Sequence, residues 1–339
     1  MKSALLASTP ADEDSGKGVK SVGGEPKEVG AADSDNWMAK FQNLVAHYRP
    51  GAIPEEHRLR VAILDSGIDL RHKDFKDDRR IKQTKSFIKN VDVHDTDGHG
   101  THMAGIILSL TQNVDVYVGK VTDSTETVGN YTAEIAEALR WAREDKDWKV
   151  HIISLSFGLG KRYAGIHTQI NLCNGQNIII FAAASNEGGN APRAYPASYD
   201  PPVLGIHAAT AEGNLWHKSP SAEPHTDNFL TVGQAVESAW LGGGKKYQSG
   251  TSVATPVAVA IAALMLGYIQ RYIRTPAEGW STSPRSPDGI RKIFRLLESN
   301  VRQNERYQWV DPVFFFETFM WQRNKINEDI IAELSNLGR

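Results

Sequence analysis

Five short apolar runs, separated by segments with helical spacing, constrain the fold more than any other feature of the sequence. They span residues 61–64, 116–121, 151–155, 178–184 and 203–208. The runs are apolar almost throughout instead of alternating with polar residues, which is typical of strands buried on both faces. Such strands, alternating with helices, predict an α/β fold of three layers, in which a mostly parallel sheet lies between two layers of helices.

The flanking segments predict additions to this core. Residues 1–36 contain no aromatic side chain and are rich in Gly, Ala, Ser, Asp and Glu, so we expect a disordered tail. Residues 37–57 are expected to form a helix and a lead-in, followed by the core at 58–272. Residues 273–339 combine a loop rich in Pro and Ser with helical patterns at 289–300 and 322–338. We expect a C-terminal helical appendage there, packed on the main domain, and no further strand.

Composition excludes several classes of function. Of the 339 residues, 40% are apolar, and the net charge is −2. This indicates a globular chain without the basic surplus that nucleic acid or an anionic membrane surface requires. The single cysteine, Cys173, excludes a disulfide framework and cysteine-based metal sites, and it fits a reducing compartment.

Two segments bear on location. The first residues lack the apolar stretch of about 7–15 residues that a secretory signal needs, so we expect a cytoplasmic protein. Segment 253–269 approaches the length of a membrane span, but it carries Pro256 and Gly267. We therefore interpret it as a buried core helix and expect no membrane partner.

Three short motifs place a carboxylate, an imidazole and a hydroxyl at the ends of predicted elements. Asp65 ends the first apolar run in VAILDSG, where ligands of open parallel sheets bind. His99 stands between two glycines in DGHGTHMAG, at the start of a helix. Ser252 stands in GTSVATP at the start of the apolar helix. Free backbone N–H groups and the positive end of the helix dipole suit a developing negative charge there.

Each of these residues also has an ordinary structural explanation. Asp65 and Ser252 can cap helices, and a histidine is often only a hydrogen-bonded packing residue, which is our interpretation of His102. However, the order Asp, His, Ser is one of the known chain orders of a Ser-His-Asp triad. Asn186 supports this combination, because it follows a buried strand and its amide can donate to an oxyanion.

Together the motifs resemble those of the subtilisin-like serine proteases, the subtilase family. The resemblance covers about residues 58–272. Within the family, the sequence is most similar to the intracellular subtilase domains of filamentous fungi. It implies a serine endopeptidase without a cofactor, in which Asp65, His99 and Ser252 are catalytic and Asn186 binds the oxyanion. It also implies that a peptide or protein substrate binds as an extended strand against Gly129, Ser154, Leu155, Ser156, Phe157, Gly158, Ala183, Ala184 and Ala194. The second strand that faces the substrate is expected near 128–130.

Departures from the family pattern keep a second interpretation open, a weak or inactive domain that acts as a binding or regulatory module. Ser185 and Ala194 stand where the family usually has glycine, and both narrow the expected pocket. The pro-domain of the secreted enzymes is not recognisable either. An esterase is disfavoured, because the G-x-S-x-G motif and its order of triad residues are absent.

The acidic and histidine residues at 92–99 raise the question of a metal site. A calcium-loop template fails, because its first and twelfth positions fall on Val93 and Ala104, which cannot supply the required ligands. We expect no metal and interpret the segment as a solvated loop that positions His99.

Overall fold

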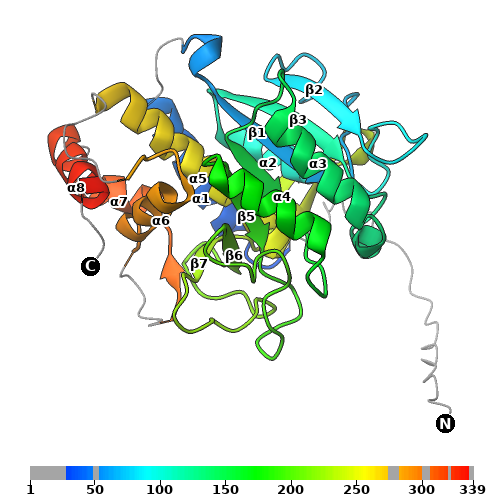
Figure 1. Ribbon diagram of the computed structural model, residues 1–339. Coiled ribbons are helices and arrows are strands. Elements are labelled where there is room, and N and C mark those ends of the chain that lie inside the picture. The colour runs from blue at the N-terminus through cyan, green and yellow to red at the C-terminus, as the bar shows by residue number, and fades with distance from the viewer. Residues whose placement is uncertain (1–27, 49–52, 274–281, 300–305, 320–321, 336–339) are drawn as a thin grey trace, which may run out of the picture.

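The computed structural model describes residues 28–48, 53–273, 282–299, 306–319 and 322–335. Its centre is a sheet formed by β1 (Leu59–Asp65), β2 (Ile81–Ser86), β3 (Val114–Lys120), β4 (Ile152–Leu155), β5 (Ile179–Ala183), β6 (Val203–Ala209), β7 (Phe229–Val232) and β10 (Gln308–Trp309). The order of these 8 strands is β10-β7-β6-β5-β4-β1-β3-β2, and all neighbouring strands run parallel (Figure 1). The predicted parallel sheet is confirmed.

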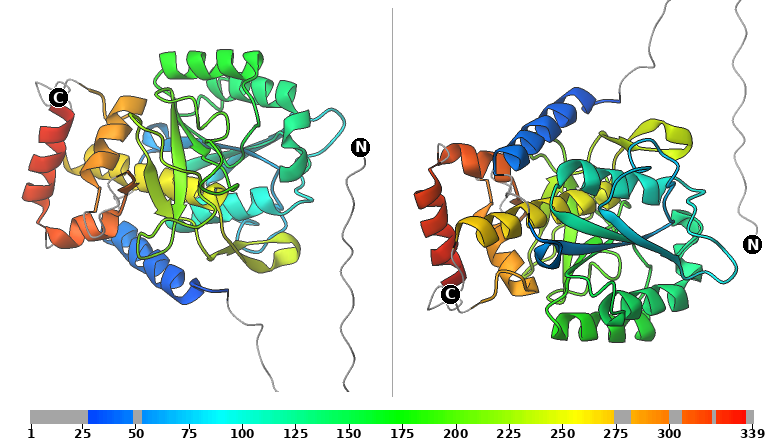
Figure 2. Two further views of the ribbon diagram at one scale, coloured as in Figure 1. Left: turned by 90° about the horizontal axis from the view of Figure 1, so that it is seen from below. Right: turned by 90° about the horizontal axis from the view of Figure 1, so that it is seen from above.

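Helices cover both faces of the sheet, which confirms the three predicted layers (Figure 2). One face carries α3 (Thr132–Glu144) and α4 (Ala164–Gly175), and the other carries α2 (His99–Leu110) and α5 (Thr251–Tyr272). Alternate residues of β1 enter two separate clusters of apolar side chains, Val61 and Ile63 on the α2 and α5 face and Ala62 and Leu64 on the α3 and α4 face. The runs are therefore apolar almost throughout because both faces of the strands are buried, as the sequence analysis suggests.

Helix α5 is the core helix. By length and composition it could cross a membrane, but 83% of its most apolar window is buried inside the fold. It packs against β4, β5, β6 and β7 and against α2. This placement agrees with the interpretation of 253–269 as a buried helix.

The N-terminal helix α1 (Ala31–His47) begins within the segment predicted to be disordered. Ala31 and Ser34 are buried on the same face as the aromatic residues of the helix. The Ser34 hydroxyl also donates to the Gln234 carbonyl at 2.6 Å. These long-range contacts compensate for the low apolar content of 31–36, so the predicted tail extends too far. Residues 1–27 of that tail lie outside the described residues.

The C-terminal segment packs on the core and also adds a strand to its sheet. It contains α6 (Pro287–Leu296), α7 (Pro312–Thr318) and α8 (Arg323–Ser335), which gather beside α5 (Figure 1). The expectation of no further strand is wrong, because β10 pairs with β7 at the edge of the sheet. A strand of two residues is too short to produce a sequence pattern. The described residues also form a hairpin of β8 (Val236–Ala239) and β9 (Lys245–Gln248) and the 3₁₀ helices η1 (Glu55–His57), η2 (Thr125–Asn130) and η3 (Leu241–Gly243).

Candidate active site

The parallel sheet gathers the predicted site residues at one edge. The neighbouring strands β1, β4 and β5 end at Asp65, Leu155 and Ala183. Parallel strands present their carboxyl ends at the same edge, so the segments that follow these three strands meet there. Asn186 follows β5, and 156–158 follow β4.

Asp65 and His99 form a buried hydrogen-bonded pair at this edge. His99 Nδ1 lies 2.8 Å from Asp65 Oδ1, and the Ser66 N–H donates to the same oxygen at 2.7 Å. The two residues are only 1% and 7% exposed. With Nδ1–H donating to the carboxylate, Nε2 of the neutral ring is the acceptor. The pair therefore presents a proton acceptor of fixed orientation.

The surroundings of His99 make its ring a stronger base. Burial lowers the pKa of His99, but the charge and hydrogen bond of Asp65 outweigh burial, with smaller contributions from Asp97 and Asp95. The net result is a pKa above the ordinary 6.5. A raised pKa favours proton transfer to this ring.

Asp95 organises the turn that carries His99. Asp95 Oδ1 accepts from the Ser66 hydroxyl at 3.0 Å and from the Gly98 N–H at 2.9 Å. Asp95 Oδ2 accepts from the Thr101 N–H at 2.8 Å and from the Thr101 hydroxyl at 2.7 Å. Burial raises the pKa of Asp95, but these bonds outweigh burial and lower it. Asp95 has no exposed surface, so the expectation of a solvated loop is wrong at this residue.

Lys120 is a second positioning group that the sequence analysis missed. It ends β3, lies beside Asp65 in the sheet register and has no exposed surface. Its Nζ donates to the Ser66 carbonyl at 2.9 Å and to the His94 carbonyl at 3.0 Å. It thereby joins the segment after Asp65 to the loop before His99. A lysine at the end of an apolar strand was the only signal in the sequence.

The acidic loop uses its oxygens for internal hydrogen bonds. Besides Asp95, Asp92 Oδ1 accepts from the His94 N–H at 2.9 Å. Among the residues that the structure describes, no group of three or more His, Cys, Asp or Glu side chains is placed to hold a metal ion.

Ser252 is the second residue of α5, directly after a strained turn. Gly250 has φ 155° and ψ 170°, a conformation that is almost exclusive to glycine. A Cβ on Gly250 would lie 2.9 Å from Asn186 Nδ2 and 3.3 Å from Ser252 Oγ. The glycine therefore allows the Asn186 amide and the Ser252 hydroxyl to approach the same point.

Asn186 is tied to the start of the same helix. Its Oδ1 accepts from the Thr251 N–H at 2.8 Å and from the Thr251 hydroxyl at 3.0 Å. In the described part of the chain, the Ser252 N–H has no hydrogen-bond partner. An amide and an unpaired N–H at the positive end of a helix are suitable donors to an anion.

His99 and Ser252 stand at the starts of two helices, α2 and α5, that pack against each other. Within the described residues, no hydrogen bond joins the His99 ring to the Ser252 hydroxyl. Such contacts are often long in a free enzyme and tighten when substrate binds.

A cleft of about 460 Å³ opens beside Ser252 and Asn186. The predicted substrate-binding residues that line it are Ser156, Phe157, Gly158, Ala183 and Ala194. Three others, Ser154, Leu155 and Ala184, are buried and do not line it. Charged residues that also line the cleft and that the sequence analysis missed are Lys161, Arg162 and Glu187, together with Arg193, whose side chain is buried behind the cleft.

Gly129 lies outside this cleft and is exposed. The strand expected at 128–130 is wrong, because these residues belong to the 3₁₀ helix η2. The Thr127 N–H bonds to the Ser124 carbonyl, and the Tyr131 N–H bonds to the Val128 carbonyl. With the Val128 side chain buried, these local bonds favour a turn over an extended strand.

A buried Asp-His pair and a serine, standing at the starts of two helices that pack against each other, are the parts that serine hydrolases use in catalysis. Comparison with known proteins narrows this class. The model of the subtilase family matches residues 57–280. The chain belongs to the subtilase family, which confirms the predicted class of subtilisin-like serine endopeptidases.

Similar proteins occur in a fungus and in bacteria. The subtilisin-like protease het-Q2 of Podospora anserina is 31% identical over 62% of this chain and 70% of its own length. The thermostable alkaline protease of Halalkalibacterium halodurans is 30% identical over 70% of this chain and 64% of its own length. Subtilisin E of Bacillus subtilis is 31% identical over 61% of this chain and 55% of its own length. The matched region thus spans between 55% and 70% of these relatives.

Proposed function

We propose that this protein cleaves peptide bonds with Ser252 as nucleophile, His99 as general base and Asp65 as the group that orients His99. The observation that carries the proposal is the buried 2.8 Å contact between His99 Nδ1 and Asp65 Oδ1. It holds the ring in the tautomer whose Nε2 can accept a proton, and it stabilises the imidazolium that forms.

The reaction follows from these roles. Ser252 Oγ attacks the carbonyl carbon of the scissile bond, and its proton moves to His99 Nε2. The same proton then passes to the leaving amine, which leaves the acyl group esterified to Ser252. A water molecule, deprotonated by His99, hydrolyses the ester and restores the serine.

The oxyanion of each tetrahedral intermediate is proposed to bind two donors, the Asn186 amide and the Ser252 N–H. Support comes from the position of the Asn186 amide and the Ser252 hydroxyl beside Gly250 and from the unpaired Ser252 N–H at the helix start. Donors that already face the oxyanion position need no reorganisation during the reaction.

The substrate is proposed to bind as an extended strand along 156–158. These residues follow β4, and their backbone groups form no backbone hydrogen bonds within the described chain. An extended peptide can use such groups as an added strand. The side chain before the scissile bond would enter the cleft between Gly158 and Ala183. Gly129 would contact the opposite side of the peptide from η2.

We also propose that the enzyme works in the cytoplasm. The support is that its single cysteine, Cys173, cannot form a disulfide within the chain, which fits a reducing compartment. Cys173 is a buried free thiol, and burial raises its pKa to about 12. A fusion of the full chain to a fluorescent protein, imaged in the source cells, tests this location. Accumulation in the medium or in a secretory compartment would contradict it.

Hydrolysis of denatured casein by the full chain tests the proposed reaction. Mass spectrometry of the products maps the cleaved bonds, and the matched control is Ser252→Ala. We expect cleavage by the native protein and none above background by the variant. Equal cleavage by both proteins would contradict the role of Ser252. Binding of peptides without cleavage by the native protein would favour the binding module instead.

A further inference from the structure

The C-terminal helix α6 lies beyond the region matched by the family model, yet it is bonded to the back of the cleft. We propose that Arg291 of α6 is a positioning residue for one wall of the substrate cleft. The inference rests on the proposed function, because the wall matters only if the cleft binds substrate. It makes the C-terminal segment part of the substrate-binding apparatus.

The wall is the segment 192–198, which contributes to the cleft Pro192, Arg193, Ala194, Tyr195 and Ser198. Its front is held by main-chain bonds. The Ala194 N–H donates to the Ala184 carbonyl at 2.6 Å, and Leu159 and Tyr195 exchange two backbone bonds of 2.6 and 3.0 Å. These bonds fix the wall to the segments that follow β4 and β5.

The back of the wall is held by charged side chains. The Arg193 side chain has no exposed surface, and its Nη2 donates to the Asp227 carbonyl at 2.6 Å and to the Asn228 side chain. Arg193 Nη1 also lies 3.8 Å from Asp200 Oδ2. The acidic partners Asp200 and Asp227 are nearly buried. Their own position depends on the groups behind them.

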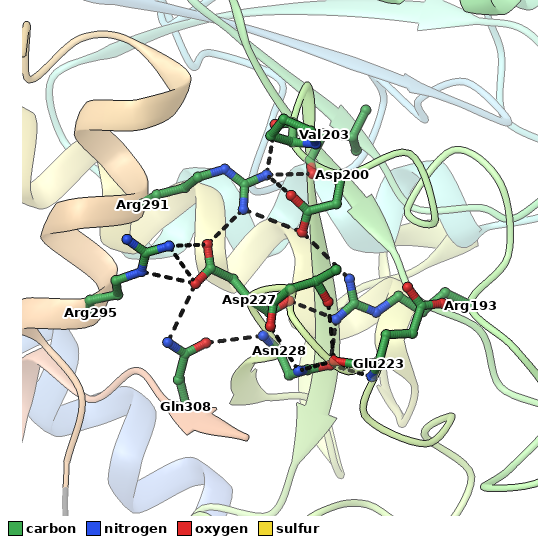
Figure 3. A network of polar contacts seen from close by, with 11 residues as sticks. Arg193, Asp200, Val203, Glu223, Asp227, Asn228, Arg291, Arg295 and Gln308 are labelled. Atoms are coloured by element: carbon green, nitrogen blue, oxygen red, sulfur yellow. Dashed lines mark hydrogen bonds and ion pairs between the residues drawn. The ribbon is translucent and has the colours of Figure 1, made fainter. Parts of the chain in front are cut away.

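Arg291 is the group behind both aspartates (Figure 3). It donates to Asp227 Oδ2 at 2.8 Å and lies 2.9 Å from Asp200 Oδ1. Its Nη2 also donates to the carbonyls of Pro201 at 2.7 Å and Val203 at 2.9 Å. One guanidinium thus holds two carboxylates and two main-chain oxygens, and its planar set of donors suits this arrangement better than an ammonium group.

The arrangement couples α6 to the cleft through a short path. Asp200 follows Ser198, the last residue of the wall, by two positions, and Pro201 and Val203 continue into β6. Without Arg291, the Asp200 carboxylate would be left nearly buried with weaker compensation and would turn toward solvent. That movement would displace the wall. A displacement of about 1 Å in substrate position can cost about 10²-fold in rate.

Arg295 provides a matched control on the same helix. Its guanidinium donates to Asp227 at 2.9 and 3.0 Å, but in the described part of the chain it forms no hydrogen bond or ion pair with residues 200–203. Its side chain is 51% exposed, whereas that of Arg291 is 6% exposed. A variant of Arg295 therefore removes a charge from the network without releasing the wall.

The test compares two serine-directed probes on the full chain. Diisopropyl fluorophosphate is small and needs only Ser252 and its neighbours, whereas a peptidyl diphenyl phosphonate must also place a side chain in the cleft. For Arg291→Gln we expect labelling by the peptidyl probe to slow by about 10- to 100-fold, with labelling by the small probe changed by less than about threefold. For Arg295→Gln we expect both rates within about threefold of those of the native protein.

The outcomes separate the possible explanations. Unchanged labelling of Arg291→Gln by the peptidyl probe would overturn the inference, and so would an equal loss with both probes. If Arg291→Gln does not fold, Asp200→Asn is tested instead, with the same selective loss expected and the same results overturning the inference. A native protein that reacts with neither probe would contradict the proposed function itself.

Discussion

The backbone N–H of Thr251 donates to the side-chain oxygen of Asn186 at 2.8 Å, which ties the start of the helix carrying Ser252 to the loop after β5. This bond orients the amide of Asn186 by its oxygen and leaves its nitrogen as a donor. The side chain therefore has two separable tasks, one in structure and one in the proposed oxyanion site.

Two substitutions of Asn186 separate these tasks. Asn186→Asp keeps an oxygen for Thr251 but removes the amide donor, whereas Asn186→Ala removes both. We expect kcat to fall by about 10²–10³ in both variants, because one oxyanion donor is lost. Only Asn186→Ala should also lose stability, by about 1 kcal/mol. Steady-state kinetics and thermal unfolding measure the two effects. Activity of Asn186→Asp near the native level would contradict the oxyanion role.

The pH dependence of kcat/KM reports the protonation of His99. His99 must be neutral to accept a proton, so activity should fall as pH decreases through its pKa. Because Asp65, Asp97 and Asp95 raise that pKa, the midpoint should lie above 6.5. Asp97→Asn should move the midpoint to lower pH, since a negative charge near the ring is removed.

Asp92→Asn is the matched control for this measurement. Asp92 belongs to the same loop but is exposed and does not contribute to the raised pKa of His99. Its midpoint should equal that of the native protein. A midpoint that moves equally in both variants would show that loop structure, not the charge of Asp97, governs the profile.

Gly158 and Ala194 test the shape of the cleft. A Cβ added to Gly158 would overlap the Cβ of Ala194. We expect Gly158→Ala to raise KM for peptide substrates by about tenfold, because one wall must move. The double variant with Ala194→Gly should recover most of this loss, since the overlapping methyl group is gone. Additive losses in the double variant would refute direct contact between the two positions.

His102 should make the protein less stable in mild acid. It has no exposed surface, and burial lowers its pKa to about 4. In the unfolded chain it takes up a proton near the ordinary histidine pKa of 6.5, so the unfolded state binds more protons between pH 6.5 and about 4. The contribution of His102 to the free energy of unfolding is therefore fully present above pH 6.5. It is lost as pH falls through about 4, and the loss amounts to about 3 kcal/mol.

Urea unfolding in a Ser252→Ala background, which prevents self-digestion, measures this dependence. His102→Gln retains a donor for the Lys246 carbonyl, to which His102 Nε2 bonds at 2.9 Å, and removes the titration. The variant should lose less stability than its parent between pH 6.5 and about 4. The exposed His225→Gln should behave like the parent. An identical loss in His102→Gln would refute the assignment.

The centre of the fold could be predicted from the sequence, and its edges could not. Strands buried on both faces, such as β1, leave an unbroken apolar run. Edge strands leave none, because β2 is only partly buried and β10 has two residues. The start of α1 was missed for a related reason. Ser34 is fixed by Gln234, a contact that no local pattern contains.

The candidate site, too, could be predicted only in part from the sequence. Asp65, His99, Ser252 and Asn186 stand in local motifs at the ends of apolar runs, so their types and spacing were informative. The residues that hold them, such as Asp95 and Lys120, act through contacts with distant segments. The predicted strand near Gly129 failed because local turn bonds decide that segment.

Mass-spectrometric mapping of a phosphonate adduct tests the triad most directly. The native chain, Ser252→Ala and His99→Ala are incubated with a biotinylated fluorophosphonate, digested and sequenced. We predict one adduct per native chain, located on Ser252, no adduct at this position in Ser252→Ala, and labelling of His99→Ala slowed by at least about 10³-fold. An adduct elsewhere, or labelling that does not depend on His99, would contradict the assignment of Asp65, His99 and Ser252 to one catalytic unit.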